Sequence, residues 1–345
     1  MSDPQVGDRI SNYLLEEVVG SGSFGQVWRA RHHVFDEVVA IKIPTDLQYV
    51  RNLQREGVAV HGLKHPNIVR ALDLDPYADP PYLIMEYVAG PSLRQALEAN
   101  PQGLPIPAVV EIMRGLLAAL DVAHQAGLIH RDVKPANILL QTAGGGLERI
   151  AEVTRKSVKV TDFGLGRVGG ITTASIMQSG SALTEAGKSI SGTLAYMSPE
   201  QKEGQVDARS DLYACGIVLF EMLTGERPSG TEMPGSVRSE VPKYLDEVFQ
   251  GSYTRLDRRY PSAAAMLEAL APPPSVPAPP SPPPTAAGRA CPQCQGATRP
   301  DDQFCIHCGH QLAAEVPRCS SCHAFVGRQD RYCIFCGTKL ESNPV

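Results

Sequence analysis

Two short polar clusters hold residue types that suit phosphoryl transfer. The first is the segment 130–137, HRDVKPAN, and the second is the segment 162–164, DFG. An aspartate can accept a hydroxyl proton, a lysine can stabilise transferring phosphate charge, and an amide with a carboxylate can hold Mg²⁺. The candidates for these roles are Asp132, Lys134, Asn137 and Asp162. Either cluster alone could be a polar turn, but both in this order predict one site.

A glycine-rich segment lies near the start of the chain. Residues 20–27 read GSGSFGQV, and the candidate phosphate-binding residues are Gly20, Ser21, Gly22, Ser23, Phe24 and Gly25. Glycine has no Cβ, so backbone N–H groups there can approach phosphate oxygens closely. A dinucleotide-binding loop would run directly into a helix, whereas Val27 and Trp28 predict a strand. The alternative is a glycine-rich hairpin that binds nothing.

Lys42 ends an apolar run, Ala40-Ile41-Lys42, seventeen residues after Gly25. Burying its ammonium is costly unless an anion compensates the charge. The candidate anions are a nucleotide phosphate and the carboxylate of Glu56 on a following predicted helix. The alternative is an ammonium that reaches solvent on its long side chain.

Cysteines are distributed unevenly. The chain has nine among 345 residues, and eight of them form four Cys-x-x-Cys pairs in two repeats with a period of 28 residues. Two such pairs supply the four thiolates that suit tetrahedral Zn²⁺, so the repeats resemble tandem zinc ribbons with two structural Zn²⁺ ions. The predicted ligands are Cys291, Cys294, Cys305, Cys308, Cys319, Cys322, Cys333 and Cys336. Without a secretion signal, the clustering favours metal over a disulfide framework.

Apolar patterns divide the remaining chain in two. Short β-branched runs predict a mainly antiparallel sheet with strands over Tyr13–Val19, Val27–Arg31, Val38–Ile43, Ile68–Leu74 and Tyr82–Tyr87. Three- and four-residue spacing predicts helices over Leu47–Leu63, Ala108–Ala126, Leu212–Leu223 and Ala263–Leu270. The fold class is therefore α+β, with a β-rich N-lobe, an α-rich C-lobe and a cleft between them that suits a ligand.

A proline-rich linker follows this body. Nine of the thirteen residues from Pro272 to Pro284 are proline, which favours an extended, solvated chain. The predicted organisation is a catalytic domain over 13–271, a linker over 272–289, a first zinc ribbon over 290–314 and a second over 315–345.

The motifs of residues 13–270 resemble those of Hanks-type serine/threonine protein kinases. The resemblance implies a bilobal protein-kinase-like fold that transfers the γ-phosphate of ATP, with Mg²⁺ or Mn²⁺, to Ser or Thr hydroxyls of protein substrates. It implies that Asp132 is the catalytic base and that Lys134 contacts the γ-phosphate. It further implies that Asn137 and Asp162 bind the metal.

The same resemblance assigns the nucleotide site. The glycines of segment 20–25 would cover the phosphates, and Lys42, held by Glu56, would pair with the α- and β-phosphates. The residues implied around the adenine are Val27, Ala40, the gatekeeper Met85, and the hinge residues Glu86, Tyr87 and Val88. Further matches are Ser198-Pro199-Glu200, Asp211 at the start of the central C-lobe helix, and Arg259 as the partner of Glu200.

Two stretches depart from the family pattern. Residues Gln141 to Ser157 form an insert where the family has a tight turn. We expect a surface loop there, and the alternative is an insert that docks a partner. The stretch from Gly225 to Arg259 is short, so the helix that often docks protein substrates should be reduced or absent.

Composition restricts partners and location. A net charge of −5 gives no general attraction to nucleic acid or anionic lipid. Residues 288–345 hold six Lys or Arg and five Asp or Glu, and two zinc ions with eight thiolates would bring this module to about −3. We therefore expect a protein partner at the ribbons and no nucleic acid. No spanning apolar run or signal peptide is evident, which predicts a cytoplasmic protein; no feature indicates an oligomeric state.

Two interpretations from other classes compete with a kinase. In one, the kinase fold only binds nucleotide and the chain is a scaffold whose ribbons recruit partners. In the other, the ribbons sense nucleic acid and gate the kinase, which the charge of the ribbon module disfavours.

Arg131 and a hydroxyl-rich segment generate the first testable prediction. Nine Ser or Thr residues lie between Thr172 and Thr193. We expect autophosphorylation within Thr172 to Ser191 to order this segment through Arg131, the alternative being a flexible polar loop. Phosphopeptide mapping after incubation with ATP tests this, and a fully active enzyme with an unmodified segment would contradict it.

Overall fold

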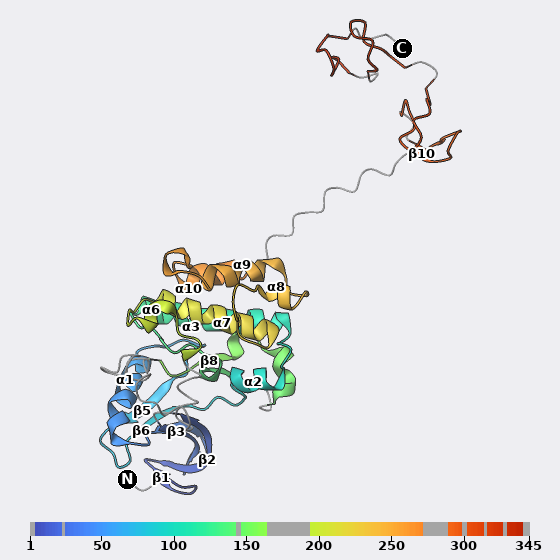
Figure 1. Cartoon of the computed structure of the whole chain (residues 1–345). Coiled ribbons are helices and arrows are strands. Elements are labelled where there is room, and N and C mark those ends of the chain that lie inside the picture. The colour runs from blue at the N-terminus through green and yellow to red at the C-terminus, as the bar shows by residue number, and fades with distance from the viewer. Residues whose placement is uncertain are drawn as a thin grey trace. The chain divides into compact units, whose positions relative to one another are not determined.

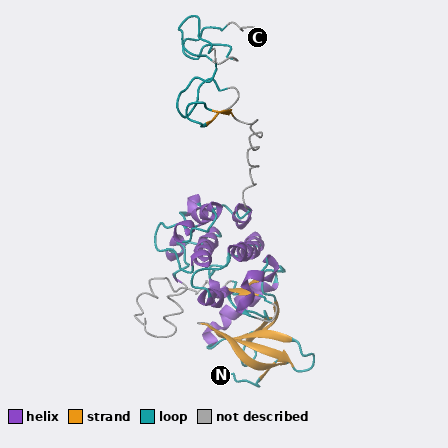
Figure 2. Ribbon diagram, turned by 90° about the vertical axis from the view of Figure 1, so that its right-hand side faces the viewer, coloured by secondary structure: helices purple, strands orange, loops and turns teal. Residues whose placement is uncertain are grey.

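The computed structural model describes residues 4–22, 25–142, 146–163, 194–271, 289–298, 302–313, 316–326 and 330–340. The chain divides into two compact units, residues 1–273 and 274–345. In the first unit the strands gather at one end and most helices at the other (Figure 1). The view coloured by secondary structure shows the same separation (Figure 2).

The N-lobe, residues 4–86, is built on a six-stranded antiparallel sheet. Its strands, in spatial order, are β1 (Arg9–Ile10), β2 (Tyr13–Gly22), β3 (Gly25–His32), β4 (Val38–Ile43), β6 (Tyr82–Glu86) and β5 (Ala71–Asp75). The expected antiparallel sheet is therefore confirmed. One strand begins later than expected, because Ile68 forms a bridge with Val160 of the C-lobe instead of joining β5.

One long helix packs on this sheet. After a 3₁₀ turn over Leu47–Tyr49, helix α1 (Val50–His61) lies against β5 and β6. Its buried side includes Leu53, Glu56 and Val60. A glutamate on a buried helix face needs a positive partner, because an isolated buried carboxylate is strongly unfavourable.

The described part of the C-lobe, residues 92–142, 146–163 and 194–271, is mainly helical. Its helices are α2 (Leu93–Ala99), α3 (Ile106–Gln125), α6 (Pro199–Lys202), α7 (Arg209–Thr224), α8 (Pro234–Val237), α9 (Lys243–Ser252) and α10 (Ala263–Ala269). A short hairpin of β7 (Ile138–Leu140) and β8 (Val158–Val160) completes the lobe. None of the helices in the described part of the chain is both long and apolar enough to cross a membrane.

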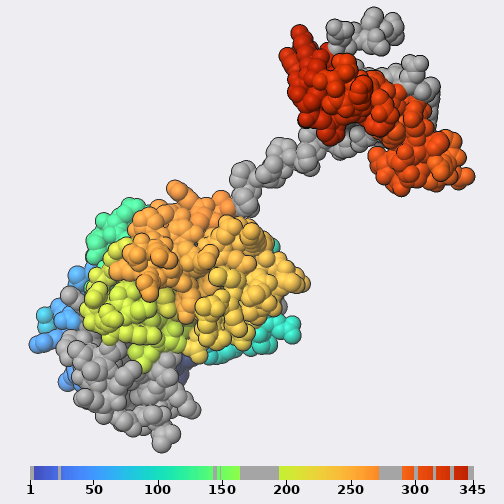
Figure 3. Space-filling view, turned by 45° about the horizontal axis from the view of Figure 1, so that its top comes forward, coloured from blue at the N-terminus to red at the C-terminus, as the bar shows by residue number. Residues whose placement is uncertain are grey.

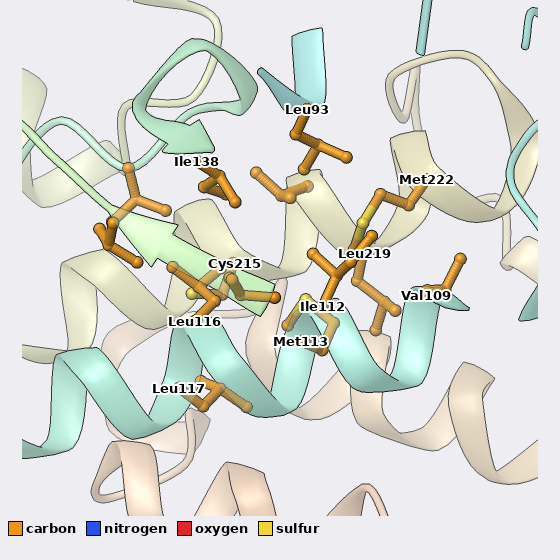
Figure 4. Close-up of a cluster of buried hydrophobic side chains, with 14 of the residues drawn as sticks. Leu93, Val109, Ile112, Met113, Leu116, Leu117, Ile138, Cys215, Leu219 and Met222 are labelled. Carbon is orange, nitrogen blue, oxygen red and sulfur yellow. The ribbon is translucent and has the colours of Figure 1, made fainter. Parts of the chain in front are cut away.

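Helix α7 is the centre of the C-lobe. It is buried on nearly all sides, as expected for a helix without a polar face. Its Leu219 and Met222 pack against Ile112 and Met113 of α3 (Figure 4). Cys215, the only cysteine outside the repeats, is fully buried in the same core. At the end of α7, Gly225 has φ +85°, and a Cβ there would lie 2.0 Å from the carbonyl oxygen of Pro101.

The insert between β7 and β8 lies at the surface, as expected, because most of its described residues are exposed, and two buried side chains anchor it to the core. The amide of Gln141 donates to the carbonyl of Ser157 at 2.8 Å and closes its base. Between them lie 3₁₀ turns over Leu147–Glu152 and Arg155–Ser157. Two apolar side chains, Ile150 and Val153, are buried in the main core and anchor the segment.

The stretch after Gly225, where a reduced or absent helix was expected, holds only a short one before α9. Between Gly225 and α9, the described chain contains only α8, a single turn of four residues. Residues 194–271, coloured yellow-green to orange, form a continuous surface in the space-filling view (Figure 3).

The second unit contains both cysteine repeats. Strands β9 (Arg289–Ala290) and β10 (Ala297–Thr298) pair in the first repeat. Isolated antiparallel β-bridges flank the other three Cys-x-x-Cys turns: Phe304 with Gln311, Arg318 with Phe325, and Tyr332 with Lys339. The ring of Phe304 lies 5.2 Å from that of Phe325 in an edge-to-face arrangement. The guanidinium of Arg318 lies 4.0 Å above the Phe325 ring. An aromatic contact therefore joins the two repeats.

A buried ion pair connects α6 to the end of the C-lobe, as expected. The guanidinium of Arg259 donates to both carboxylate oxygens of Glu200, at 2.6 and 3.2 Å. The hydroxyl of Ser210 donates to the same carboxylate at 2.7 Å. Burial alone would raise the pKa of Glu200, but the bonds from Arg259, Ser198 and Ser210 outweigh it and lower this pKa to about 2.

This pair should stabilise the fold in a pH-dependent way. Since the pKa of Glu200 falls from 4.5 to about 2 on folding, its contribution is present above pH 4.5 and is lost as pH falls towards 2. Arg259→Ala, which leaves a buried carboxylate unpaired, should lower the free energy of unfolding by about 3–5 kcal/mol at pH 7. Denaturation curves between pH 3 and pH 7 measure this difference, which should shrink in acid.

The matched control is Arg149→Ala, since Arg149 forms an exposed pair with Glu152 at 3.5 Å. It should change stability by less than about 1 kcal/mol at every pH. An Arg259→Ala variant as stable as the wild type at pH 7 would contradict the assignment.

Candidate active site and metal centres

The register of one hairpin brings two candidate metal ligands together. Strands β7 and β8 pair antiparallel with Ile138 opposite Val160. The start of β7 therefore lies beside the end of β8, and the amide of Thr161 donates to the carbonyl of Asn137 at 3.0 Å. Asn137 precedes β7 and Asp162 follows β8, so two residues 25 positions apart become neighbours.

The segment 130–137 is held by a buried carboxylate on α7. Asp211 accepts hydrogen bonds from the backbone amides of His130 at 2.9 Å and Arg131 at 2.8 Å. The Nε2 atom of His124 lies 2.7 Å from the same carboxylate. Sequence reasoning placed Asp211 at the start of a helix but did not find this role. An acidic residue at the start of a largely apolar helix was the available signal, because such a charge needs buried partners.

Three of the predicted catalytic residues meet directly. The ammonium of Lys134 lies 2.9 Å from the carboxylate of Asp132. The side-chain amide of Asn137 donates to the carbonyl of Asp132 at 2.8 Å and to its carboxylate at 3.1 Å. The carboxylate of Asp132 is therefore fixed by one charge and one amide.

A second cluster joins the two lobes. The ammonium of Lys42 lies 2.8 Å from the carboxylate of Glu56 and 2.8 Å from that of Asp162. Lys42 is 6 % exposed and Glu56 1 %. Burial lowers the pKa of Lys42, but the two carboxylates outweigh it and raise that pKa. Lys42 therefore stays charged, and its ammonium does not reach solvent as the alternative supposed.

The glycine segment is the hairpin between β2 and β3. Gly20 pairs with Val27 and Gly22 with Gly25, while Ser23 and Phe24 lie outside the described residues. A Cβ on Gly25 would lie 2.4 Å from the carbonyl oxygen of Ile43, so packing requires glycine there. A Cβ on Gly20 would meet nothing closer than 3.6 Å. Packing within the chain does not explain Gly20, which fits a position kept open for a ligand.

The residues assigned to the adenine converge on one apolar cluster. Ala40, Met85 and Val88 are buried together, and Val27 packs against them. The side chain of Glu86 points elsewhere: it pairs with Lys159 at 2.7 Å and accepts from the amide of Arg70 at 3.0 Å. Only the backbone of Glu86 can therefore contact a nucleotide in this arrangement.

The donor set beside Asp132 fits a magnesium ion. Mg²⁺ prefers carboxylate and amide oxygens and is bound by few protein ligands. Asp162 supplies a carboxylate, and Asn137 supplies an amide whose nitrogen is engaged by Asp132. The residues present thus suit the metal that ATP requires. Gly164, Thr193 and the expected phosphorylation segment 172–191 lie outside the described residues.

Eight cysteines form two compact four-sulfur clusters, as predicted. In each cluster the sulfur atoms all lie within 4.8 Å of one another. Within each cluster, Sγ atoms from the two different Cys-x-x-Cys turns lie 3.5 to 3.7 Å apart. With Zn–S bonds of about 2.3 Å, tetrahedral zinc places its sulfurs about 3.8 Å apart. The described histidines take no part in either cluster.

The four Cys-x-x-Cys turns are copies of one backbone structure. In each, the residue four positions after the first cysteine has a positive φ between 59° and 74°. Its amide donates to the carbonyl of that first cysteine at 2.8 to 2.9 Å. The residues at this position are Gln295, Gly309, His323 and Gly337. The turns aim both cysteine sulfurs at a common point, so the duplication in sequence is also one in structure.

Removing a single ligand should release one ion. Cys305→Ser should lower the zinc content from two ions per chain to about one, because three thiolates leave the tetrahedral shell incomplete. Cys333→Ser should do the same for the other cluster, and Cys215→Ser, a buried thiol outside the repeats, should retain both. Metal analysis of the purified chain measures this. Two ions in Cys305→Ser, or none in the wild type, would contradict the zinc assignment.

Two known protein families match the two parts of the chain that contain these sites. The family model for the protein kinase domain matches residues 13–269, and the model for the double zinc ribbon matches residues 291–337. The Myxococcus xanthus serine/threonine-protein kinase pkn3 is 40 % identical over 235 residues, which are 66 % of this chain and 40 % of that protein. Mycobacterium tuberculosis PknL is 34 % identical over 269 residues, 76 % of this chain and 58 % of the relative.

A solved structure shares the fold. The kinase domain of Mycobacterium tuberculosis PknI superposes with a TM-score of 0.57 at 24 % identity, covering 77 % of this chain and 98 % of that one. The chain spans 40 % to 58 % of the length of the two curated relatives above. With the kinase family model matching most of its residues, this chain belongs to the protein kinase family and carries a double zinc ribbon.

Proposed function

We propose that this chain is a serine/threonine protein kinase that transfers the γ-phosphate of MgATP to Ser or Thr hydroxyls of protein substrates. The observation that carries this proposal is the position of Lys42, whose ammonium lies 2.8 Å from both Glu56 and Asp162. These three residues come from β4, α1 and the end of β8, so both lobes must be correctly arranged for them to meet. The two carboxylates compensate the buried ammonium, so Lys42 is held charged at the boundary of the lobes, where it can meet a phosphate.

Each of the site residues would have a distinct role in phosphate transfer. Asp132 would accept the proton of the substrate hydroxyl, and Lys134 beside it would stabilise the transferring phosphate charge. Asn137 and Asp162 would hold Mg²⁺, which neutralises phosphate charge when bound. Lys42 would orient the α- and β-phosphates beneath the glycine hairpin. The apolar cluster around Ala40 and Val88 would hold the adenine.

We further propose that the double zinc ribbon is a separately folding, protein-binding module. The knuckle residues Ile306 and Ile334 occupy equivalent positions in the two repeats and are 79 % and 81 % exposed. Exposed apolar side chains suit contact with a protein. The near-neutral to negative charge of the module, about −3 with zinc, supports a protein over a nucleic acid.

Substitution of the proposed catalytic base tests the activity. Asp132→Asn should lower the rate of phosphate transfer to a protein substrate by about 100-fold or more, because the amide cannot accept the proton. Lys42→Met should also abolish activity, while retaining two zinc ions per chain because the ribbons fold separately. Radiolabelled phosphate transfer and metal analysis of the same samples measure both.

Conservative changes elsewhere are the controls. Asp257→Asn and Lys64→Met alter exposed residues outside the site and should leave activity unchanged. Equal and negligible turnover by the wild type and Asp132→Asn would support a scaffold instead. Joint loss of zinc and activity in Lys42→Met would contradict separate folding.

A further inference from the structure

Several cations gather where the end of the insert meets the loop before β5. The side-chain amide of Asn67 in that loop donates to the carbonyl of Arg155 at 2.5 Å, which holds the two segments together. Arg155 and Lys156 are exposed at the end of the insert, and Arg70 is exposed just before β5. Lys159, on β8, is partly buried between them in the sequence. The face therefore draws its positive charge from both lobes.

The carboxylate of Glu86 links two of these cations. It lies 2.7 Å from the ammonium of Lys159 and accepts the backbone amide of Arg70 at 3.0 Å. The amide of Glu86 in turn donates to the carbonyl of Arg70 at 3.0 Å. Arg70 and Lys159 are thus held to one acidic residue, although one precedes β5 and the other lies on β8.

The carboxylates on this face already have positive partners. The pairs and their separations are Glu86 with Lys159 at 2.7 Å, Glu111 with Arg114 at 2.7 Å, and Glu152 with Arg149 at 3.5 Å. The second oxygen of Glu111 accepts the backbone amide of Arg155 at 2.9 Å. No ion pair in the described part of the chain includes Arg70, Arg155 or Lys156. Even with Glu148 counted, whose side chain lies outside that part, the carboxylates remain fewer than the cations.

The imidazole of His65 lies within this positive field. Burial lowers the pKa of His65, and Arg155 and Lys159 lower it further; the charged groups that act on the ring are both positive. Its Nδ1 atom accepts the amide of Asn67 at 3.2 Å, so the neutral ring carries its hydrogen on Nε2. The ring is therefore an uncharged donor beside two cations, an arrangement that favours an anion over a cation.

Separate carboxylates suit this face better than a continuous polyanion. Glu86, Glu111 and Glu152 lie among the cations and would repel a phosphate backbone or a flat anionic membrane. The net charge of −5 also opposes general attraction of such polyanions to the chain. Individual Asp or Glu side chains can meet the cations one at a time, and arginine binds carboxylates through charge-assisted hydrogen bonds.

We propose that Arg70, Arg155 and Lys156 form a docking surface for an acidic segment, rich in Asp or Glu, of a protein partner. The Nε2 atom of His65 adds an uncharged donor. None of these side chains belongs to the proposed ATP or magnesium site, so the inference goes beyond the kinase function and does not depend on it. It gives the insert between β7 and β8 the docking role that the sequence left open as an alternative.

Binding of short peptides to the full chain tests this surface. The probes are fluorescently labelled peptides in which Gly alternates with Glu, with Gln or with Lys. Fluorescence anisotropy should show the Glu peptide binding about 10-fold more tightly than the Gln peptide, because several exposed charge pairs each contribute modestly. The Lys peptide should bind most weakly. Added salt should reduce the difference, since exposed charges are screened.

Removing the three exposed cations should abolish the preference. In the triple variant Arg70→Ala, Arg155→Ala and Lys156→Ala, the Glu and Gln peptides should bind alike. Charge reversal with Arg155→Glu and Lys156→Glu should make the Lys peptide bind better than the Glu peptide. A substitution that only loosened the fold would weaken all three peptides together and would not invert their order.

A matched control removes the same charge from another part of the C-lobe. Lys243→Ala, Arg255→Ala and Arg258→Ala delete three exposed cations on α9 and in the segment after it. This triple variant should keep the wild-type preference for Glu over Gln. An equal loss in both triple variants would mean that net charge alone attracts the peptide, and it would overturn the docking surface.

Two further outcomes would also overturn the proposal. The first is equal binding of the Glu and Gln peptides by the wild type, or a preference that the first triple variant retains. The second comes from parallel titrations with oligouridylate and with vesicles that contain phosphatidylserine. If either bound more tightly than the Glu peptide and lost its binding in the first triple variant, the surface would belong to a nucleic acid or a membrane. An inactive chain that still binds the Glu peptide contradicts only the proposed kinase function.

Discussion

The carboxylate of Asp211 is the contact on which the geometry of the catalytic segment depends. That segment is polar, and Arg131 within it has φ +67°, so apolar packing alone cannot position it. Two backbone amides, of His130 and Arg131, are satisfied by this one acceptor. Leaving such buried donors unpaired would cost about 1–3 kcal/mol each. Because Asp211 lies on α7, the apolar core packed around α7 holds this carboxylate in place. Asp211 in turn fixes the backbone of Arg131, next to Asp132.

The two lobes are joined by charge and by backbone pairing together. Asn67 and Val69, just before β5, exchange backbone hydrogen bonds with Val160 of β8, and the side chain of Asn67 donates to the carbonyl of Val158 at 2.8 Å. These bonds hold β8 against the N-lobe. Asp162, two residues after β8, is thereby carried to Lys42. The charge cluster and the hairpin register depend on each other, because a buried lysine is tolerated only when its carboxylates are in place.

Different interactions stabilise each of the two units of the chain. The kinase unit has an extensive apolar core around α3 and α7. In the second repeat of the ribbon unit, the buried apolar cluster consists of Cys319, Val326 and Cys333, with Leu340 packed against them. So small a core cannot offset the conformational entropy of folding, and metal–thiolate bonds must supply the difference. In the sequence, a proline-rich segment at residues 272–284 separates the kinase domain from the cysteine repeats.

Residue types and their spacing determined the catalytic candidates, the sheet, the main helices and both sulfur clusters, because motifs and periodicity are local properties of a sequence. Tertiary structure decided the rest. The burial of Ile150 and Val153 anchored the surface insert to the core, and Ile68 paired with Val160 instead of extending β5. The role of Asp211 depends on partners about 80 residues away in sequence, His130 and Arg131. Local patterns report which side chains are apolar or charged, whereas only the folded chain decides which of them meet.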